Sequence, residues 1–194
     1  MDESNGYEGI AQVYIQSRGR AVNGIGASTA RAWARTFRKD SVVLDLGCGT
    51  GIPVTKILLE EGLKAYALDA SPKMVEAFRQ NFPDVPVACE SIERSSFFHR
   101  TFDGIIAVGL MFLLPAETQR ALISKMAAGL NAGGKLLFTA PVDIHEWKDA
   151  MTEQLSRSLG GEQYRMLITA TGLSLGEEYR DEGGNHYFSG IRPV

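Results

Sequence analysis

The chain has 194 residues, 44% of them hydrophobic, which suits one domain with a buried core and is too short for two domains of ordinary size. The formal net charge is -3, and acidic and basic residues are interspersed, so no basic patch is available for a nucleic acid backbone. The N-terminal residues are acidic rather than signal-like, and the longest apolar run, residues 105–114, is about half of a membrane span. We therefore expect a cytoplasmic protein without nucleic acid or membrane partners.

Two helices are predicted before the first strand. Apolar and aromatic residues recur at helical spacing over residues 7–18, and again after Ser28, which is a suitable N-cap for a second helix. Glycines interrupt the pattern between them. We expect residues 1–40 to form a helical segment in front of a core that spans residues 41–194, all within a single domain.

Strands and helices then alternate. The predicted strands are residues 41–46, 64–69, 85–90, 104–110 and 135–140. Helices are expected from Pro53 to about Glu61, from the cap Ser71 onward, and from Pro115 to the glycines at 133 and 134. This alternation predicts parallel strands that are covered by helices on both faces.

The C-terminal part breaks the alternation. Residues 145–159 have a mixed helical pattern, and a further helix is expected over residues 162–171. Two β-rich runs, residues 173–180 and 186–192, follow and are joined by the glycine-containing loop DEGGN, which is typical of a hairpin. The sequence therefore predicts a doubly wound, Rossmann-like α/β fold with a mainly parallel sheet and a C-terminal antiparallel hairpin.

The turn after the first strand reads LDLGCGTGIP, residues 44–53. A dinucleotide fingerprint would place its third glycine at Ile52, and a P-loop would need Lys and Ser or Thr directly after Gly51. Neither pattern is present. What remains is a glycine-rich turn after the acid Asp45, with a second acid, Asp69, at the end of the next strand.

Several segments resemble motifs of the class I S-adenosylmethionine-dependent methyltransferases. These are VVLDLGCGTG, ALDASPKM, FDGIIAVG and LNAGGKLLFT, and the resemblance extends from about residue 41 to residue 194. It implies a seven-stranded sheet in the order 3-2-1-4-5-7-6, the cofactor S-adenosyl-L-methionine, and the product S-adenosyl-L-homocysteine. No metal is implied.

The resemblance also implies which residues bind the cofactor. Asp69 would accept the ribose hydroxyls, Met74 would pack on adenine, Glu90 would accept from its amino group, and the first helix would close over the cofactor as a lid. The full implied set is Tyr14, Arg18, Asp45, Gly47, Cys48, Gly49, Gly51, Asp69, Ala70, Met74, Glu90, Ser91, Ile92 and Val108.

The methyl acceptor would lie at the carboxyl ends of the strands. His145 and His186 are the candidates for a general base there, although a direct displacement can proceed by positioning alone. DNA amino methyltransferases have an Asn or Asp, two prolines and an aromatic residue after the fourth strand, where this chain has Gly109, Leu110, Met111 and Phe112. The apolar residues 110–114 suggest a pocket wall for a small, partly apolar acceptor, and a place in the core beneath the next helix is the alternative. We expect a monomer or homodimer.

Three alternatives remain open. The chain could be a non-catalytic S-adenosylmethionine-binding regulatory or partner subunit, or a protein or RNA methyltransferase. It could also be a NAD(P)-dependent oxidoreductase, although Ile52 and the terminal hairpin oppose that interpretation.

Overall fold

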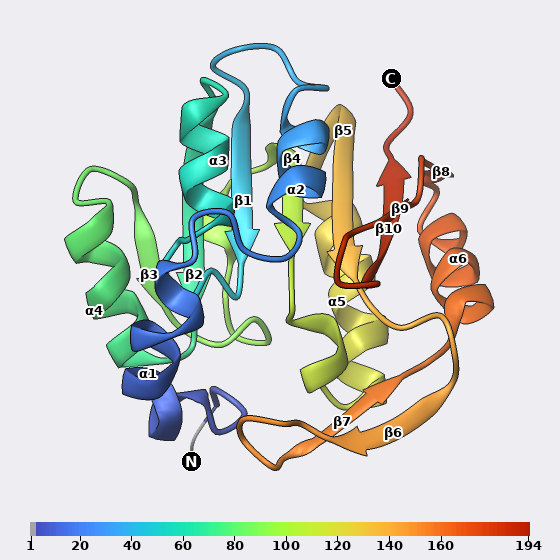
Figure 1. Cartoon of the computed structure of the whole chain (residues 1–194). Helices are drawn as coiled ribbons and strands as arrows, with labels where there is room; N and C mark the ends of the chain where they lie inside the picture. The colour runs from blue at the N-terminus through green and yellow to red at the C-terminus, as the bar shows by residue number, and fades with distance from the viewer. Residues whose placement is uncertain (1–2) are drawn as a thin grey trace.

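The computed structural model describes residues 3–194, and strands and helices alternate along most of them (Figure 1). The strands of the main sheet are β1 (Val42–Leu46), β2 (Lys64–Asp69), β3 (Val87–Cys89), β4 (Phe102–Ala107), β5 (Leu130–Thr139), β8 (Ser174–Leu175), β9 (Tyr179–Arg180) and β10 (His186–Ile191). The helices are α1 (Tyr7–Gln16), α2 (Ala27–Ala34), α3 (Val54–Glu60), α4 (Pro72–Asn81), α5 (Ala116–Ala128) and α6 (Gly161–Ala170). Short 3-10 turns are η1 (Arg18–Arg20), η2 (Phe97–His99) and η3 (Met111–Leu113), and a separate hairpin consists of β6 (His145–Lys148) and β7 (Leu155–Ser158).

The main sheet has the predicted strand order. The described residues place its strands in the order β3-β2-β1-β4-β5-β10-β8, with β9 also paired to β10. The first five of these strands run parallel, and β10 is antiparallel to β5. The predicted strand 173–180 is divided into β8 and β9. The pairing with β10 is interrupted between them, where Gly176 lies against Ser189 of β10.

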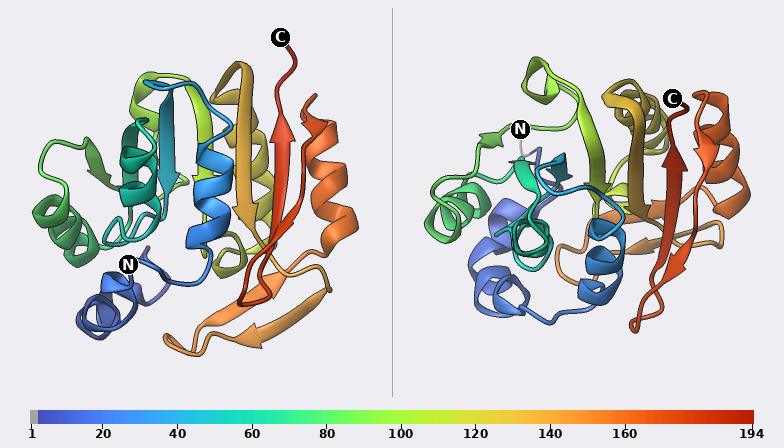
Figure 2. Two further views of the ribbon diagram at one scale, coloured as in Figure 1. Left: turned by 45° about the horizontal axis from the view of Figure 1, so that its top comes forward. Right: turned by 90° about the horizontal axis from the view of Figure 1, so that it is seen from above.

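Helices cover both faces of the sheet (Figure 2). On one face, Val43 of β1 packs in a cluster with Trp33 of α2, and α3 and α4 lie on the same side. On the other face, Leu44 packs in a cluster with Met126 of α5 and Ile168 of α6. Neighbouring residues of one strand point to opposite faces, so a strand buried on both sides is apolar throughout. None of the helices within residues 3–194 is long and apolar enough to cross a bilayer.

The carboxyl ends of the parallel strands lie together at the lower edge of the sheet in Figure 1. Helix α1, turn η3 and the β6–β7 hairpin gather at this edge. In open sheets of this kind, ligands bind outside the carboxyl ends of the strands. The fold therefore assigns this edge to the functional site.

The predicted helical stretch over residues 145–159 is wrong. The segment forms the β6–β7 hairpin, in which Trp147 pairs with Ser156 and His145 pairs with Ser158. Ser156 and Ser158 are the buried residues of β7. Because the inward positions are serines, the period of two is invisible to a count of hydrophobic residues.

Two helix boundaries also differ from the predictions. Helix α5 ends at Ala128 and Leu130 belongs to β5, where it pairs with Phe102; an apolar residue at a boundary fits either element. Helix α2 begins after Gly26, which has a φ of 85°, and Ser28 is not its cap. The Ser28 hydroxyl instead donates to Glu182 at 3.1 Å, so it bonds a residue far away in the sequence and not a backbone N–H of α2.

Candidate cofactor and acceptor site

An open cavity of about 950 Å³, counted with the space at its mouth, lies at the carboxyl ends of β1, β2 and β4. Its walls come from the glycine turn, the start of α4, the segment after β3, turn η3, the N-terminal segment and the β6–β7 turn. The lining residues are Glu3, Ser4, Asn5, Tyr7, Tyr14, Arg18, Gly47, Gly49, Leu68, Asp69, Ala70, Met74, Glu90, Ile92, Glu93, Val108, Gly109, Leu110, Phe112, Leu113, Leu114 and Asp149.

The glycine turn brings the backbone close to this cavity. Gly47 and Gly49 have positive φ angles of 67° and 54°, a region that L side chains rarely adopt. A Cβ at Gly47 would lie 3.2 Å from Leu110, and one at Gly49 would lie 3.6 Å from Tyr14. Both positions favour glycine because of their backbone conformation, and at Gly47 the neighbouring Leu110 also leaves little space for a Cβ.

Asp69 organises the turn from the end of β2. Its Oδ2 accepts the Gly49 N–H at 2.8 Å, and its Oδ1 accepts the Ser71 N–H at 2.9 Å. A carboxylate oxygen can accept more than one hydrogen bond, so Asp69, which lines the cavity, keeps acceptor capacity for a ligand. Burial raises the pKa of Asp69, while backbone hydrogen bonds from Ser71, Gly49 and Ala70 oppose this effect.

Helix α1 is attached to the core beside Asp69. The Glu8 carboxylate accepts from the Ser71 hydroxyl at 2.5 Å and from the Lys73 N–H at 3.1 Å. Ser71 is also the predicted N-cap of α4, accepting from the Met74 N–H at 3.2 Å. These contacts hold α1 over the cavity, and they place Tyr14 against the glycine turn.

Four of the implied cofactor residues are not in the cavity wall: Asp45, Cys48, Gly51 and Ser91. The positive φ of Gly51, 80°, places its missing Cβ 2.5 Å from Phe82 and 2.8 Å from Phe78. Gly51 therefore leaves space for two aromatic rings, one in α4 and one directly after it, and it does not border the cavity. Cys48 packs against the same Phe78.

The other ten implied residues do line the cavity. They are Tyr14, Arg18, Gly47, Gly49, Asp69, Ala70, Met74, Glu90, Ile92 and Val108. They come from α1, η1 and the ends of four strands or the segments after them. Lining a cavity does not by itself show binding, so their roles stay with the proposal below.

The two histidines predicted to face the acceptor lie outside the cavity wall. His186 Nε2 is 2.6 Å from Glu178 Oε2, and its ring packs on Phe188 at the far end of the sheet. His145 stacks on Trp147 with ring centroids 4.6 Å apart, on the exposed side of the hairpin. Both histidines lie at strand ends, as predicted from the sequence. His186, however, contacts Glu178, which in turn pairs with Arg165 of α6. A general-base role for either stays a prediction without support from the cavity geometry.

Several cavity residues were missed by the sequence interpretation, above all Tyr7 and Asp149. Tyr7 was counted only as part of a buried helix face, and Asp149 lay in the stretch interpreted as helical. Burial and the nearby Asp149 raise the pKa of Tyr7 to about 12. The sequence feature that came closest to identifying Asp149 is that residues 141–149 directly follow a predicted parallel strand.

Asp45 is a buried carboxyl group beneath the glycine turn. Only 2% of its surface is exposed, and its Oδ2 accepts the Thr55 hydroxyl at 2.6 Å. Burial raises its pKa to about 7; the Thr55 hydrogen bond opposes the shift and Asp69 adds to it. The folded protein therefore holds a proton here that the unfolded chain releases near the ordinary pKa of 3.8.

This shift predicts how stability depends on pH. Between about pH 4 and about pH 7 the folded state binds more protons at Asp45 than the unfolded state, so raising the pH lowers stability. Across that window we expect wild type to lose about 2 to 4 kcal/mol relative to Asp45→Asn, which cannot titrate. Urea unfolding of both proteins over a pH series measures this difference. Parallel pH curves would show that Asp45 does not titrate in this range.

Comparison with known proteins agrees with this geometry. Residues 43–134 match the family model described as a methyltransferase domain. A carboxy-S-adenosyl-L-methionine synthase from Actinobacillus succinogenes is 28% identical over 160 residues, covering 76% of this chain and 64% of the relative. A tRNA U34 carboxymethyltransferase from Aliarcobacter butzleri is 27% identical over 103 residues, covering 51% of this chain and 33% of the relative. The chain spans 64% and 59% of the two carboxy-S-adenosyl-L-methionine synthases that it matches.

Solved structures extend the likeness to the whole fold. Magnesium protoporphyrin IX methyltransferase from Synechocystis, crystallised with bound SAM, has a TM-score of 0.71 at 17% identity, covering 99% of this chain and 98% of that one. A methyltransferase in complex with its activator from Haloferax volcanii has a TM-score of 0.80 at 18% identity, covering 98% and 97%. At these identities the likeness shows the fold. Together with the methyltransferase domain matched over residues 43–134 and the strand order, it shows that the chain has the fold of the class I S-adenosylmethionine-dependent methyltransferases.

Proposed function

We propose that this chain binds S-adenosyl-L-methionine in the cavity and transfers its methyl group to a small molecule. The charge of the cavity carries this proposal. Five carboxylates line it, from Glu3, Asp69, Glu90, Glu93 and Asp149, and the one cationic side chain among the described lining residues is Arg18. An acidic cavity attracts a cofactor whose sulfonium and ammonium outweigh its single carboxylate. It disfavours the pyrophosphate of NAD(P), which opposes the oxidoreductase alternative.

The residues present fit the parts of this cofactor. Asp69 keeps acceptor capacity for the ribose hydroxyls, and Met74 and Ile92 offer an apolar surface for adenine, with Glu90 in the same cavity wall. Arg18 and Tyr14 of the α1 and η1 lid are suited to the methionine carboxylate. The bound cofactor supplies an electrophilic methyl group, and the protein aligns the nucleophile and excludes water.

Methyl transfer fits the cavity better than carboxymethyl transfer, the activity in the name of one relative. A carboxymethyl group adds a second carboxylate to the cofactor, which needs its own cation. Arg18 is the one cation in the described cavity wall, and the other charges there are negative. The chain's own charges thus favour the unmodified cofactor.

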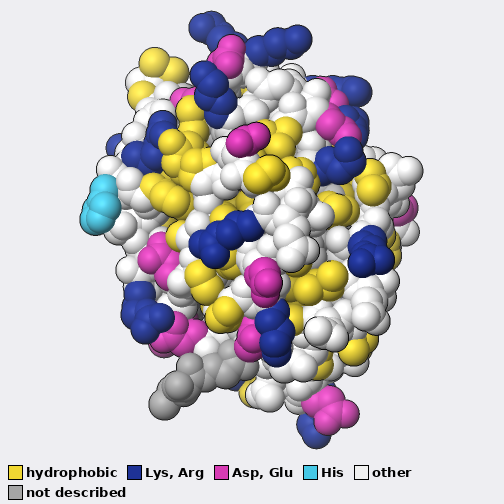
Figure 3. Space-filling view, turned by 90° about the vertical axis from the view of Figure 1, so that its left-hand side faces the viewer, with side chains coloured by type: hydrophobic (Ala, Val, Ile, Leu, Met, Phe, Trp, Pro, Cys, Tyr) yellow, Lys and Arg dark blue, Asp and Glu magenta, His cyan; other side chains and the backbone are white. Residues whose placement is uncertain are grey.

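A small acceptor fits better than a macromolecule. Helix α1 and the β6–β7 hairpin both lie across the cavity edge of the sheet (Figure 1). On the face that carries α1 and α4, positive and negative side chains are interspersed (Figure 3), unlike the continuous basic surface that tracks a nucleic acid. We propose a monomer or homodimer; the complex of the Haloferax neighbour with an activator makes a protein partner the alternative.

Two measurements test the function. Isothermal titration is expected to show one site for S-adenosyl-L-homocysteine, with carboxy-S-adenosyl-L-methionine and NADH at least about tenfold weaker. With methyl-labelled cofactor and a size-fractionated cell extract, label is expected in the low-molecular-mass fraction. Label confined to protein or RNA would replace the small-molecule proposal, and binding without any transfer would favour a non-catalytic subunit.

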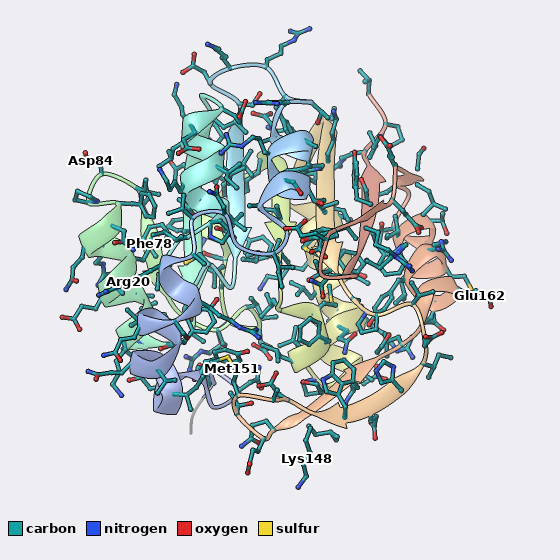
Figure 4. The ribbon with its side chains drawn as sticks, in the orientation of Figure 1. Arg20, Phe78, Asp84, Lys148, Met151 and Glu162 are labelled. Carbon is teal, nitrogen blue, oxygen red and sulfur yellow. The ribbon has the colours of Figure 1, made fainter. Side chains whose placement is uncertain are left out.

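Arg18 provides a test of the lid. The guanidinium is exposed at the cavity and has no hydrogen bond or ion pair to another described residue. We expect Arg18→Ala to weaken S-adenosyl-L-homocysteine binding about tenfold, because a charge-assisted hydrogen bond to the carboxylate is lost. Arg20→Ala is the matched control, since Arg20 lies in the same turn, outside the cavity wall (Figure 4). Equal affinities for both variants would contradict the lid role of Arg18.

A further inference from the structure

One part of the cavity wall combines polar and apolar side chains from outside the glycine turn. It is formed by Tyr7 at the start of α1, Asp149 in the β6–β7 turn, and the apolar residues Leu110, Phe112 and Leu113 around η3. Three parts of the chain that are far apart in sequence meet here. We call this set the acceptor end.

The acceptor end is a built structure and not a loose surface. A Cβ at Gly6 would lie 3.1 Å from Thr152 and 3.3 Å from Gln154, so the N-terminal segment packs closely on the hairpin turn. Phe112 packs on Trp147 of β6 with ring centroids 5.6 Å apart, which connects η3 to the same hairpin. Figure 4 labels Met151, two residues after Asp149 in the hairpin turn.

Asp149 has one committed oxygen and one free oxygen. Its Oδ1 accepts from the N–H groups of Met151 at 3.0 Å and Thr152 at 2.8 Å, and from the Thr152 hydroxyl at 3.1 Å. These bonds fix the turn and the direction of the carboxylate. Its Oδ2 accepts no hydrogen bond from any residue in the described part of the chain, although Asp149 is half-buried in the cavity wall.

Tyr7 adds a second unused polar group. Its ring meets Tyr14 edge-on at 5.8 Å, and its hydroxyl has no hydrogen-bond partner among residues 3–194. Tyr7 and Asp149 line the same cavity. Burial raises the pKa of the phenol and Asp149 raises it further, so the phenol is uncharged near neutral pH. A neutral phenol can both donate and accept a hydrogen bond.

The remaining charges at this end are also acidic. Glu93 lines the cavity without an ion pair within the described residues, whereas Glu3 is neutralised by Arg94. Arg18 is the one cation among the described lining residues, and it lowers the pKa of Tyr7 whereas Asp149 and Asp69 raise it. Negative charge therefore outweighs positive charge here, which disfavours an anionic acceptor, and a neutral hydroxyl compound would donate a hydrogen bond to Asp149 but leave its charge uncompensated.

We infer that the methyl acceptor is a small amine with an apolar body, whose nitrogen lies at Asp149 and Tyr7 and whose body packs on Leu110, Phe112 and Leu113. This inference rests on the proposed methyltransferase function and specifies its substrate class.

The chemistry balances without a further reactant. The amine releases a proton to solvent, and the lone pair of its neutral nitrogen then forms the new N–C bond. The S–C bond breaks, and its electron pair stays on sulfur, which becomes a neutral thioether. Positive charge thus moves from sulfur to nitrogen, and a fixed carboxylate beside the nitrogen stabilises the charge as it arrives. The methylated ammonium leaves and exchanges its proton with water.

Matched ligands test this inference in the presence of saturating S-adenosyl-L-homocysteine. The probes are benzylamine, phenethylamine and cyclohexylmethylamine, each compared by calorimetric titration with the alcohol and the carboxylate of the same carbon skeleton. We expect at least one amine to bind about tenfold more tightly than its alcohol, and the carboxylates to bind least. In Asp149→Asn that preference should fall to about twofold or less, because the amide oxygen still supports the turn but the charge is gone.

Glu146→Gln is the matched control, because Glu146 is an exposed acid on the same hairpin outside the cavity wall. It should keep the full preference for the amine. If no amine binds better than its alcohol and carboxylate, or if Asp149→Asn keeps the preference, the inference is overturned. Failure of S-adenosyl-L-homocysteine itself to bind would instead overturn the proposed function, so the two failures are distinguishable.

Discussion

Replacing Asp69 by asparagine is expected to weaken S-adenosyl-L-homocysteine binding about 100-fold or more. Two charge-assisted hydrogen bonds to the ribose hydroxyls would be lost, each with a contribution of about 1.5 to 3 kcal/mol. The substitution also places an amide NH2 near one of the two backbone N–H groups that the carboxylate now accepts, from Gly49 and Ser71. Both effects act on the same cofactor end of the cavity.

The measurement is calorimetric titration of wild type and Asp69→Asn, with thermal unfolding of both proteins to confirm that the variant is folded. Asp84→Asn serves as the control, because Asp84 is an exposed acid in the loop between α4 and β3, far from the cavity (Figure 4). It should bind within about twofold of wild type. A folded Asp69→Asn protein with near wild-type affinity would remove Asp69 from the cofactor site.

Replacing Gly51 by alanine is expected to destabilise the fold by about 3 to 4 kcal/mol. The backbone there has φ of 80°, which costs an L residue about 1 to 2 kcal/mol. The added Cβ would also lie 2.5 Å from Phe82 and 2.8 Å from Phe78. Relieving this overlap requires movement of two packed rings, at a further cost of about 1 to 3 kcal/mol.

Gly172→Ala separates these two contributions. Gly172 has φ of 83°, nearly the same backbone conformation, but an added Cβ there would meet no atom within 4 Å. Urea unfolding should therefore show a loss of about 1 to 2 kcal/mol for Gly172→Ala and about twice that or more for Gly51→Ala. Equal losses for the two variants would mean that the rings move aside without cost.

These two predictions differ in how far the sequence alone supports them. The acid at residue 69 follows from local pattern, because an apolar run that ends in an acid and is followed by Ser71 and Pro72 marks a strand end and a helix start. The role of Gly51 could not be found in this way. Its neighbours Phe78 and Phe82 belong to the next helix and its end, and nothing in the glycine motif distinguishes contact with a ligand from contact with those rings.

The acceptor end shows the same limit more clearly. Tyr7 and Asp149 are separated by most of the chain, and the hairpin that carries Asp149 has serines at its buried positions. Helical and strand periodicities report only on neighbours along the sequence. The family resemblance implied a lid, and the apolar run at residues 110–114 suggested a pocket wall, but neither contained a signal that Asp149 would line the same cavity as Tyr7.

The sequence by itself determined the alternation of strands and helices, the glycine turn and the acid at the end of β2, because each depends on short segments whose residue types and spacing restrict the local backbone. The strand order followed from the resemblance of its motifs to those of class I methyltransferases. Only the tertiary structure decided which of those residues reach the cavity, that His186 pairs with Glu178 instead of facing it, and which groups form its acceptor end. These outcomes depend on packing between elements far apart in the chain, which no local spacing encodes.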